Sequence, residues 1–221
     1  MKFKGYVKSV IGGREMNQDA FLVANDIGVY AVADGIGGGL KGEVASKMAV
    51  EGFRSHFKPT TTMTETVKYL QASIYQEAIN SFGEAVMGTT FTSVHLTELE
   101  ATLCHIGDSH LYLYDGKILK LLTQDHEQWD ENLKGTVLCS YLGLDTKSFP
   151  LKIQEEHFQV IPGNRLLICS DGLYRQMEEM RIVTLIRENF QNPTELLEKL
   201  CSEASKVNHS DNITVVYVEI D

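Results

Sequence analysis

Short apolar segments separated by glycine, aspartate and asparagine recur along the chain and predict β-strands. One such segment begins at Val29, runs without a charged residue to Asp34, and is followed directly by glycine. This pattern is typical of a buried strand that leads into a sharp turn. The other predicted strands are Phe3–Ile11, Phe21–Val23, Gly88–Leu96, Glu100–Ile106, His110–Tyr114, Lys117–Leu122, Ile153–Ile161, Arg165–Cys169 and Ile213–Ile220. The four strands from residue 88 to residue 122 are expected to form an antiparallel meander.

Apolar positions three and four residues apart predict helices in two pairs. The first pair lies within Lys41–Gly83, and the second pair begins with a helix over Met177–Glu188. The last helix has Asn192 as its cap and Pro193 at its first position. The order strands, helix pair, strands, helix pair, strand is typical of an α+β domain whose helices cover packed sheets. We expect a single domain over residues 1–221.

The stretch from Thr123 to Pro150 shows no sustained periodicity. We interpret it as an irregular excursion with a short helical piece. The single tryptophan, Trp129, lies in this stretch and is expected to anchor it to the body of the protein.

Five aspartates stand at the ends of predicted strands: Asp19, Asp34, Asp108, Asp171 and Asp211. Taken alone, Asp34 can be read as the cap of the helix that follows it. If the five carboxylates gather in one place, however, they repel one another unless a cation neutralises them. Carboxylate and carbonyl oxygens suit Mg²⁺ or Mn²⁺ better than Zn²⁺. We therefore infer that these aspartates converge on a divalent metal site.

Other polar side chains near these aspartates have two interpretations each. Arg14 and Asp19 can form an ordinary surface ion pair, or Arg14 can be a guanidinium that is free to bind a phosphate or a carboxylate. Three histidines also lie near the strand ends, and we predict structural roles for them, because lone histidines in strands and turns are more often structural than catalytic. They are His105, His110 and His126.

A dinucleotide-binding fingerprint offers a competing interpretation of the glycines that follow Asp34. Gly37, Gly39 and Gly42 match G-x-G-x-x-G between a predicted strand and a predicted helix. A dinucleotide-binding unit continues with a second parallel strand, whereas a second helix is predicted here. Asp34 would also repel a pyrophosphate. We treat the match as a coincidence.

The overall charge excludes several kinds of partner. The chain has 20 basic and 30 acidic residues, a formal net charge of −10, and no block of lysine and arginine. Neither nucleic acid nor an anionic membrane surface is therefore expected as the main partner. No apolar segment suits a signal peptide or a membrane span, so we predict a cytoplasmic protein. The four cysteines form no CxxC pair and are expected to be reduced thiols.

Seven motifs carry a resemblance to a known family, and together they extend over nearly the whole chain. In order they are GGREMNQDAFLV, VADGIGG, GTT, IGDSHLYLY, LTQDH, LLICSDGLY and SDNITVVYV. Through them the chain resembles the metal-dependent type 2C serine/threonine protein phosphatases. The resemblance implies a four-layer sandwich of two antiparallel sheets flanked by helix pairs, with a short flap-like excursion over about residues 124–150. It also implies two bound Mn²⁺ or Mg²⁺ ions.

The resemblance further implies which residues bind the metal ions. Asp34 is similar to the carboxylate that bridges both ions, and the carbonyl of Gly35 is similar to a ligand of one ion. Asp171 and Asp211 resemble the ligands that complete the shell of the other ion.

Two more residues match positions that act on the substrate. Asp19 is similar to the acid that orients metal-bound water, and Arg14 resembles the arginine that grips the substrate phosphate. The implied reaction is direct attack of a metal-bound hydroxide on phosphoserine or phosphothreonine, without a phosphoenzyme.

The sequence departs from the family pattern at three positions. Gln18 stands where many members have a glutamate, which predicts weaker metal binding. Ile36 stands where a proposed general acid, histidine, is common, so the leaving group must take its proton from water or from another residue. Asp108 matches a ligand of a third ion, but Arg175 stands where a partner aspartate is frequent. This argues against a third ion and for a salt bridge between Asp108 and Arg175.

Two functions remain open from the sequence. The first is an active phosphatase whose partners are phosphorylated proteins, with a serine/threonine kinase or its targets as the counterpart. The alternative is a weakly active or inactive relative that serves as a phosphoprotein-binding regulatory module. The retention of Arg14, Asp34, Asp171 and Asp211 favours the first, because a binding module has no physical need for metal-binding acids.

Overall fold

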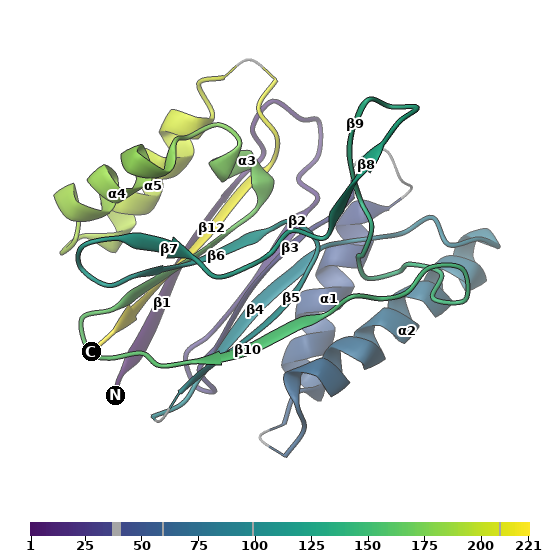
Figure 1. The fold of residues 1–221 in the computed structure, drawn as a ribbon, viewed down its shortest axis with the longest axis horizontal. Coiled ribbons are helices and arrows are strands. Elements are labelled where there is room, and N and C mark those ends of the chain that lie inside the picture. Colours follow the sequence, from purple (N-terminus) through teal and green to yellow (C-terminus); the bar gives the residue numbers. More distant parts are fainter. Residues whose placement is uncertain (37–40, 59, 99, 208) are drawn as a thin grey trace.

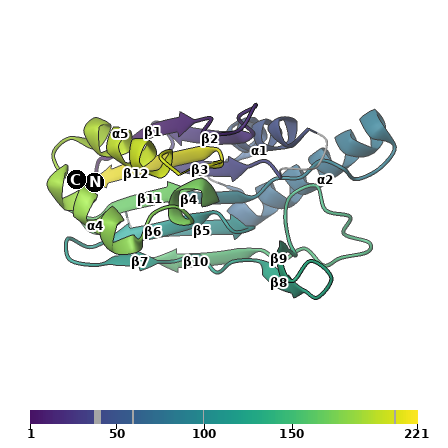
Figure 2. The same cartoon turned by 90° about the horizontal axis from the view of Figure 1, so that it is seen from above.

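A computed structural model describes residues 1–36, 41–58, 60–98, 100–207 and 209–221 of the chain. The described strands form two five-stranded antiparallel sheets that pack face to face, and a small hairpin extends from them (Figures 1 and 2). Helices α1 (Gly42–His56) and α2 (Met63–Phe82) cover one outer face. Helices α4 (Glu179–Glu188) and α5 (Pro193–Ala204) cover the other. These layers confirm the predicted α+β sandwich.

Each sheet combines strands from distant parts of the chain. The first sheet has the order β1 (Phe3–Val10), β12 (Ile213–Ile220), β11 (Arg165–Cys169), β6 (His110–Tyr114) and β7 (Leu119–Leu121). The second has the order β10 (Gln154–Phe158), β5 (Ala101–Ile106), β4 (Phe91–Leu96), β3 (Val29–Asp34) and β2 (Asp19–Ala24). The pairing of β1 with β12 places the two chain ends side by side (Figure 1).

The inner strands bury both of their faces. In β12, Val215 and Tyr217 pack toward α4 and α5, whereas Val216 and Val218 pack between the sheets. Successive side chains of a strand point to opposite faces, so a strand with a core on each side needs apolar residues at every position. This double burial explains why β3 is a continuous apolar run up to Asp34 and why β12 is apolar except at Thr214 and Glu219.

Side-chain caps fix the starts of two helices. Thr62 and Glu65 form a capping box at the start of α2, in which each side chain accepts a hydrogen bond from the other residue's backbone N–H. At the start of α5 the Asn192 side chain accepts from the backbone of Glu195, and Pro193 occupies the first turn, as predicted. The single turn α3 (Asp171–Tyr174) was not predicted, because four residues are too few to show helical periodicity.

The prediction of one meander over residues 88–122 was wrong. Strands β4 and β5 pair with each other in the second sheet, whereas β6 and β7 pair in the first. The chain therefore passes from one sheet to the other at the turn Gly107–Ser109. A turn sequence specifies a change of direction, but the sheet that the next strand joins depends on its tertiary partners.

The prediction of a short helical piece after residue 123 was also wrong. This stretch forms a two-stranded hairpin, β8 (Glu127–Asp130) and β9 (Gly135–Leu138), which projects from the body of the molecule (Figure 1). Trp129 is 58% exposed on β8, so it does not anchor the loop. No buried face supports the hairpin, and its strands therefore lack the alternation that identifies a strand in sequence.

Three further predictions concern the chemistry of the chain. Gly37 and Gly39 of the glycine fingerprint lie outside the described residues. The four cysteines are free, as predicted. Within the described ranges, none of the helices combines the length and the apolar character that crossing a membrane requires.

Candidate active site

The register of the second sheet brings two predicted acids together. Asp19 begins β2, Asp34 ends β3, and the two are directly opposite each other in the antiparallel pairing. Asp34 is held from the neighbouring segment, since its backbone N–H donates to Thr90 Oγ1 at 2.9 Å and its carbonyl accepts from Thr89 Oγ1 at 2.8 Å. Gly35 follows, with its N–H bonded to the carbonyl of Gln18. The carboxylates of Asp19 and Asp34 therefore share one end of the sheet.

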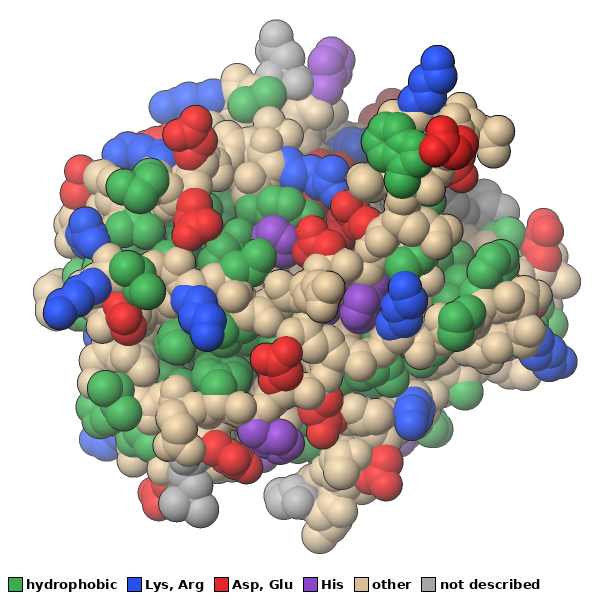
Figure 3. Space-filling model, viewed as in Figure 1, with side chains coloured by type: hydrophobic (Ala, Val, Ile, Leu, Met, Phe, Trp, Pro, Cys, Tyr) green, Lys and Arg blue, Asp and Glu red, His purple; other side chains and the backbone are tan. Residues whose placement is uncertain are grey.

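The other three aspartates reach the same place from the first sheet. Asp108 lies in the turn before β6, Asp171 lies two residues after the end of β11, and Asp211 lies two residues before β12. With Asp34 and Arg14 they line a cavity of about 400 Å³. Figure 3 shows acidic and basic side chains gathered in the hollow between the α3 region and the β8–β9 hairpin. The predicted convergence of the aspartates is confirmed.

Burial and the charges of neighbouring aspartates make Asp19, Asp34 and Asp171 hard to ionise in the absence of a metal ion. Desolvation raises the pKa of Asp34 well above its usual value, and the charges of the other four aspartates raise it further. Burial is also the main cause that raises the pKa of Asp19 to about 6, and that of Asp171 to about 6. A further positive charge that enters this cluster therefore stabilises its charged form.

The acids suit a hard divalent cation for two reasons. Their donor atoms are oxygens, and one carboxylate oxygen has no hydrogen-bond partner among the described residues. Among the described residues, no three acidic, histidine or cysteine side chains stand close enough to form a complete metal cage as they are. However, Asp19 Oδ1 is buried and has no hydrogen-bond partner in the described part of the chain, while Asp19 Oδ2 accepts from Ser170 Oγ at 2.8 Å. A buried carboxylate oxygen with no donor suits a cation or a water bound to one.

Arg14 lies at the rim of the cavity and pairs with Asp211, not with Asp19. Its Nη2 donates to Asp211 Oδ2 at 2.5 Å, and its side chain is half exposed. The ion pair raises the pKa of Arg14 through the hydrogen bond and the charge of Asp211. Because one nitrogen faces the carboxylate and the side chain reaches solvent, the guanidinium can offer its other N–H groups to an incoming anion.

Asn212 fixes the loop that carries Arg14, a role that was not predicted from the sequence. Its Oδ1 accepts from the backbone N–H of Gln18 at 2.8 Å, and its Nδ2 donates to the carbonyls of Ile11 and Met16 at 2.8 and 3.0 Å. Ser170 was missed in the same way. Both residues stand next to a predicted acid within one of the seven motifs. This position in the sequence is the signal that could have identified them.

Gly12 permits close contact between this loop and Asp211. Its φ is +62°, and a Cβ at this position would lie 2.0 Å from the carbonyl oxygen of Asp211. We expect Gly12→Ala to lower the free energy of unfolding by about 3 kcal/mol or more, through backbone strain and the clash. Urea denaturation measures the effect. Gly116→Ala is the matched control, because Gly116 has φ +95° but no atoms within 4 Å of the added Cβ, so it should lose about 1 kcal/mol.

The three residues that depart from the family pattern differ in their contacts. Ile36 lines the cavity. The Nε2 of Gln18 lies 3.4 Å from Glu43 Oε2 of α1. The expected salt bridge between Asp108 and Arg175 is present, with 3.0 Å between Asp108 Oδ2 and Arg175 Nη2.

The histidines make structural contacts, as predicted. His105 is buried beside Thr92, and burial is the main cause that lowers its pKa to about 3, which keeps it neutral. His110 is buried and stacks on the ring of Tyr174. His126 Nδ1 accepts from the backbone of Gly107.

Comparison with known proteins gives consistent matches. Residues 28–221 match the family profile of stage II sporulation protein E (SpoIIE). The chain is 29% identical to the serine/threonine phosphatase stp of Listeria monocytogenes, over 94% of this chain and 90% of that protein.

Two solved structures illustrate the structural similarity. MsPP, a PPM Ser-Thr phosphatase from Mycobacterium smegmatis solved in complex with cacodylate, has a TM-score of 0.80 at 28% identity, covering 99% of this chain and 98% of that one. The catalytic domain of the serine threonine protein phosphatase PstP, solved with two manganese ions, has a TM-score of 0.82 at 24% identity and covers 99% of both chains.

Proposed function

The chain belongs to the stage II sporulation protein E (SpoIIE) family of type 2C phosphatase domains, and on this premise we propose that the converging aspartates and Arg14 form its active site. The protein is a metal-dependent serine/threonine protein phosphatase, in keeping with the names of its relatives. Its substrates are accordingly phosphoproteins. The observation that carries the site assignment is the convergence of Asp34 with four other aspartates beside one arginine.

We propose that Asp34 and the Gly35 carbonyl would help to hold two Mn²⁺ or Mg²⁺ ions. Asp171 and Asp211 complete the set of ligands. The donor chemistry supports this assignment, and so does PstP, which was solved with two manganese ions. When bound, two such ions would lower the pKa of a water molecule to near neutrality and would thereby supply the nucleophile.

The remaining steps belong to protein groups. Arg14, at the rim, binds the phosphoryl oxygens and stabilises their negative charge as the bond to the seryl or threonyl oxygen breaks. Asp19, whose Oδ1 is buried without a donor among the described residues, orients the attacking water. MsPP was solved with cacodylate, a tetrahedral oxyanion, and this supports an oxyanion site in the fold.

The leaving group needs a proton that the side chain at position 36 cannot give. Ile36 lines the cavity and carries no acid, so we propose that the proton comes from solvent water. The half-open rim around Arg14 is compatible with access by water.

Phosphate release from a phosphothreonine peptide tests this function. The wild-type protein should release phosphate with Mn²⁺ and stop when EDTA is added. Failure of folded, Mn²⁺-loaded protein to release phosphate from several phosphopeptides would support the regulatory-module alternative, which the phosphatase relatives do not favour.

We further propose that residues 1–221 form one catalytic domain, that it acts in the cytoplasm, and that its counterpart is a serine/threonine kinase or that kinase's targets. Nucleic acid and membrane surfaces are not proposed as partners.

The raised pKa values of Asp19 and Asp171, both about 6, predict how pH affects the metal-free protein. Both values exceed the unfolded value of about 4, so the folded state binds protons more tightly. This contribution to stability is present below pH about 4 and is lost as pH rises to about 6. In EDTA, the Tm of wild type relative to Asp19→Asn should therefore fall between pH 4 and pH 6.

Metal binding should show the opposite dependence on pH. Ions bind the ionised carboxylates, so the increase in Tm caused by Mn²⁺ should be small at pH 5 and larger at pH 7.5. Differential scanning fluorimetry measures both effects. An increase in Tm that does not change with pH would contradict the assignment of these acids as ligands.

A further inference from the structure

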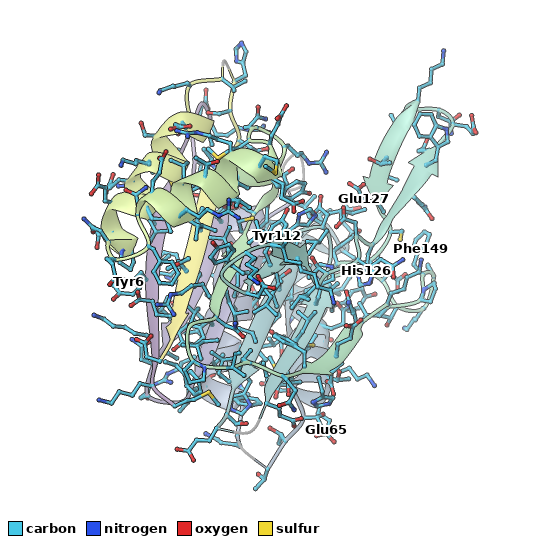
Figure 4. The ribbon with its side chains drawn as sticks, turned by 60° about the vertical axis from the view of Figure 1, so that its left-hand side comes forward. Tyr6, Glu65, Tyr112, His126, Glu127 and Phe149 are labelled. Carbon is cyan, nitrogen blue, oxygen red and sulfur yellow. The ribbon has the colours of Figure 1, made fainter. Side chains whose placement is uncertain are left out.

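Arg175 contacts three carboxylates that come from different parts of the chain. Its Nη2 lies 3.0 Å from Asp108 Oδ2 and 2.9 Å from Glu127 Oε1, and its Nε lies 3.0 Å from Asp171 Oδ2. Asp108 and Asp171 line the cavity, whereas Glu127 is the first residue of β8. Figure 4 shows Glu127 at the base of the β8–β9 hairpin, where the hairpin meets the body of the molecule. One guanidinium therefore joins two acids of the site to this hairpin.

The turn that carries Arg175 is held in place by aromatic packing. Arg175 ends α3, and its backbone N–H donates to the carbonyl of Asp171 at 3.0 Å. The ring of the preceding Tyr174 stacks on His110 with centroids 3.6 Å apart, and His110 Nε2 lies 3.0 Å from Asp125 Oδ1. The base of the Arg175 side chain thus has one defined position relative to Asp108.

Electrostatics requires a cation at this point. Asp108 is buried, and burial raises its pKa while the charge of Arg175 lowers it. The charge of Asp108 in turn raises the pKa of Asp171. Two such carboxylates are a natural pair of ligands for a divalent ion. In this chain the guanidinium of Arg175 lies between them and already binds one oxygen of each.

We propose that Arg175 is a built-in cation that takes the place of a metal ion between Asp108 and Asp171 and, through Glu127, fastens the β8–β9 hairpin to the rim of the active site. This inference rests on the proposed function, because it concerns the same acids. It limits the enzyme to two bound ions. It also makes Arg175 a positioning residue for the hairpin, whose Leu138 lines the cavity.

The β8–β9 hairpin has a second attachment to the body of the protein, which does not depend on Arg175. The backbone N–H of His126 donates to the carbonyl of Gly107 at 2.8 Å, and the N–H of Cys139 donates to the carbonyl of His126 at 2.8 Å. These bonds hold the base of the hairpin without any side-chain charge. Loss of Arg175 should therefore loosen the hairpin without unfolding it.

Counting bound metal ions tests the first half of the proposal. Equilibrium dialysis with Mn²⁺ and elemental analysis should find two ions in the wild type and a third, weaker ion in Arg175→Ala. Arg175→Lys keeps the positive charge and should stay at two. The control is Arg181→Ala, because Arg181 has a similar exposure of 43% against 45% and pairs with Glu203 on the helical layer. Three ions in the wild type, or two in both it and Arg175→Ala, would overturn the proposal. Fewer than two in the wild type would instead count against the proposed function.

The fluorescence of Trp129 tests the second half without any metal. Trp129 is the single tryptophan of the chain and lies on β8, so its steady-state anisotropy reports the motion of the hairpin. In EDTA, Arg175→Ala and Glu127→Gln should both lower the anisotropy, and Arg181→Ala should leave it unchanged. Circular dichroism establishes that each variant is folded. Unchanged anisotropy in a folded Arg175→Ala protein would show that Arg175 does not hold the hairpin.

Discussion

Asp34→Asn should abolish Mn²⁺-dependent phosphate release while the protein remains folded. The charges of four other aspartates raise the pKa of Asp34. Bound metal ions would relieve this repulsion of the Asp34 carboxylate. An amide loses the charge that attracts two ions, and metal catalysis contributes several kcal/mol to such reactions. A loss of about 4 kcal/mol corresponds to a reduction of about 10³-fold in kcat/KM.

The same variant should be at least as stable as the wild type in EDTA. Removing one charge from a crowded cluster lowers repulsion, and the asparagine keeps the size of the side chain and the backbone bonds to Thr89 and Thr90. The matched control is Asp26→Asn, which removes an equal charge from the turn at the other end of β2 and β3. Asp26→Asn should keep full activity. An Asp34→Asn protein that hydrolyses the phosphopeptide at more than a tenth of the wild-type rate would refute the role of Asp34 in metal binding.

Arg14→Ala should reduce kcat/KM for a phosphothreonine peptide by about 10²-fold. Hydrogen bonds to charged groups contribute about 1.5–3 kcal/mol, and an arginine can make two of them to one phosphoryl group. The variant should still bind Mn²⁺, because Arg14 is not a metal ligand and its removal frees Asp211 from an ion pair. Steady-state kinetics and the increase in Tm caused by Mn²⁺ measure the two effects separately.

The control for Arg14 is an arginine with a similar ion pair away from the site. Arg54 binds Asp26 through both terminal nitrogens at 3.0 and 2.6 Å, and both side chains are exposed. Arg54→Ala should leave kcat/KM unchanged. If Arg14→Lys retained full activity, a bidentate grip would be excluded, because lysine offers only a point charge.

Much of the local structure could be predicted from short-range patterns. The strand that ends at Asp34, the capped helix at Asn192 and the acids at strand ends all depend on residues within a few positions of one another. The order of seven motifs then identified the family and its sandwich fold. The failures have the same origin. The β8–β9 hairpin was interpreted as irregular because most of its side chains face solvent, and the single turn α3 is too short for periodicity.

The sequence by itself determined which residues are acidic and identified most of the strands and helices that carry them, but not the β8–β9 hairpin or α3. Only the tertiary structure decided which of these residues meet. Asp19 faces Asp34 because of the register between β2 and β3, and Arg14 pairs with Asp211 across nearly the whole length of the chain. The link from Arg175 to Glu127 had no sequence signal. The physical reason is that propensity and periodicity act over one or two turns of chain, whereas strand register and sheet packing are set by contacts between segments that are distant in sequence.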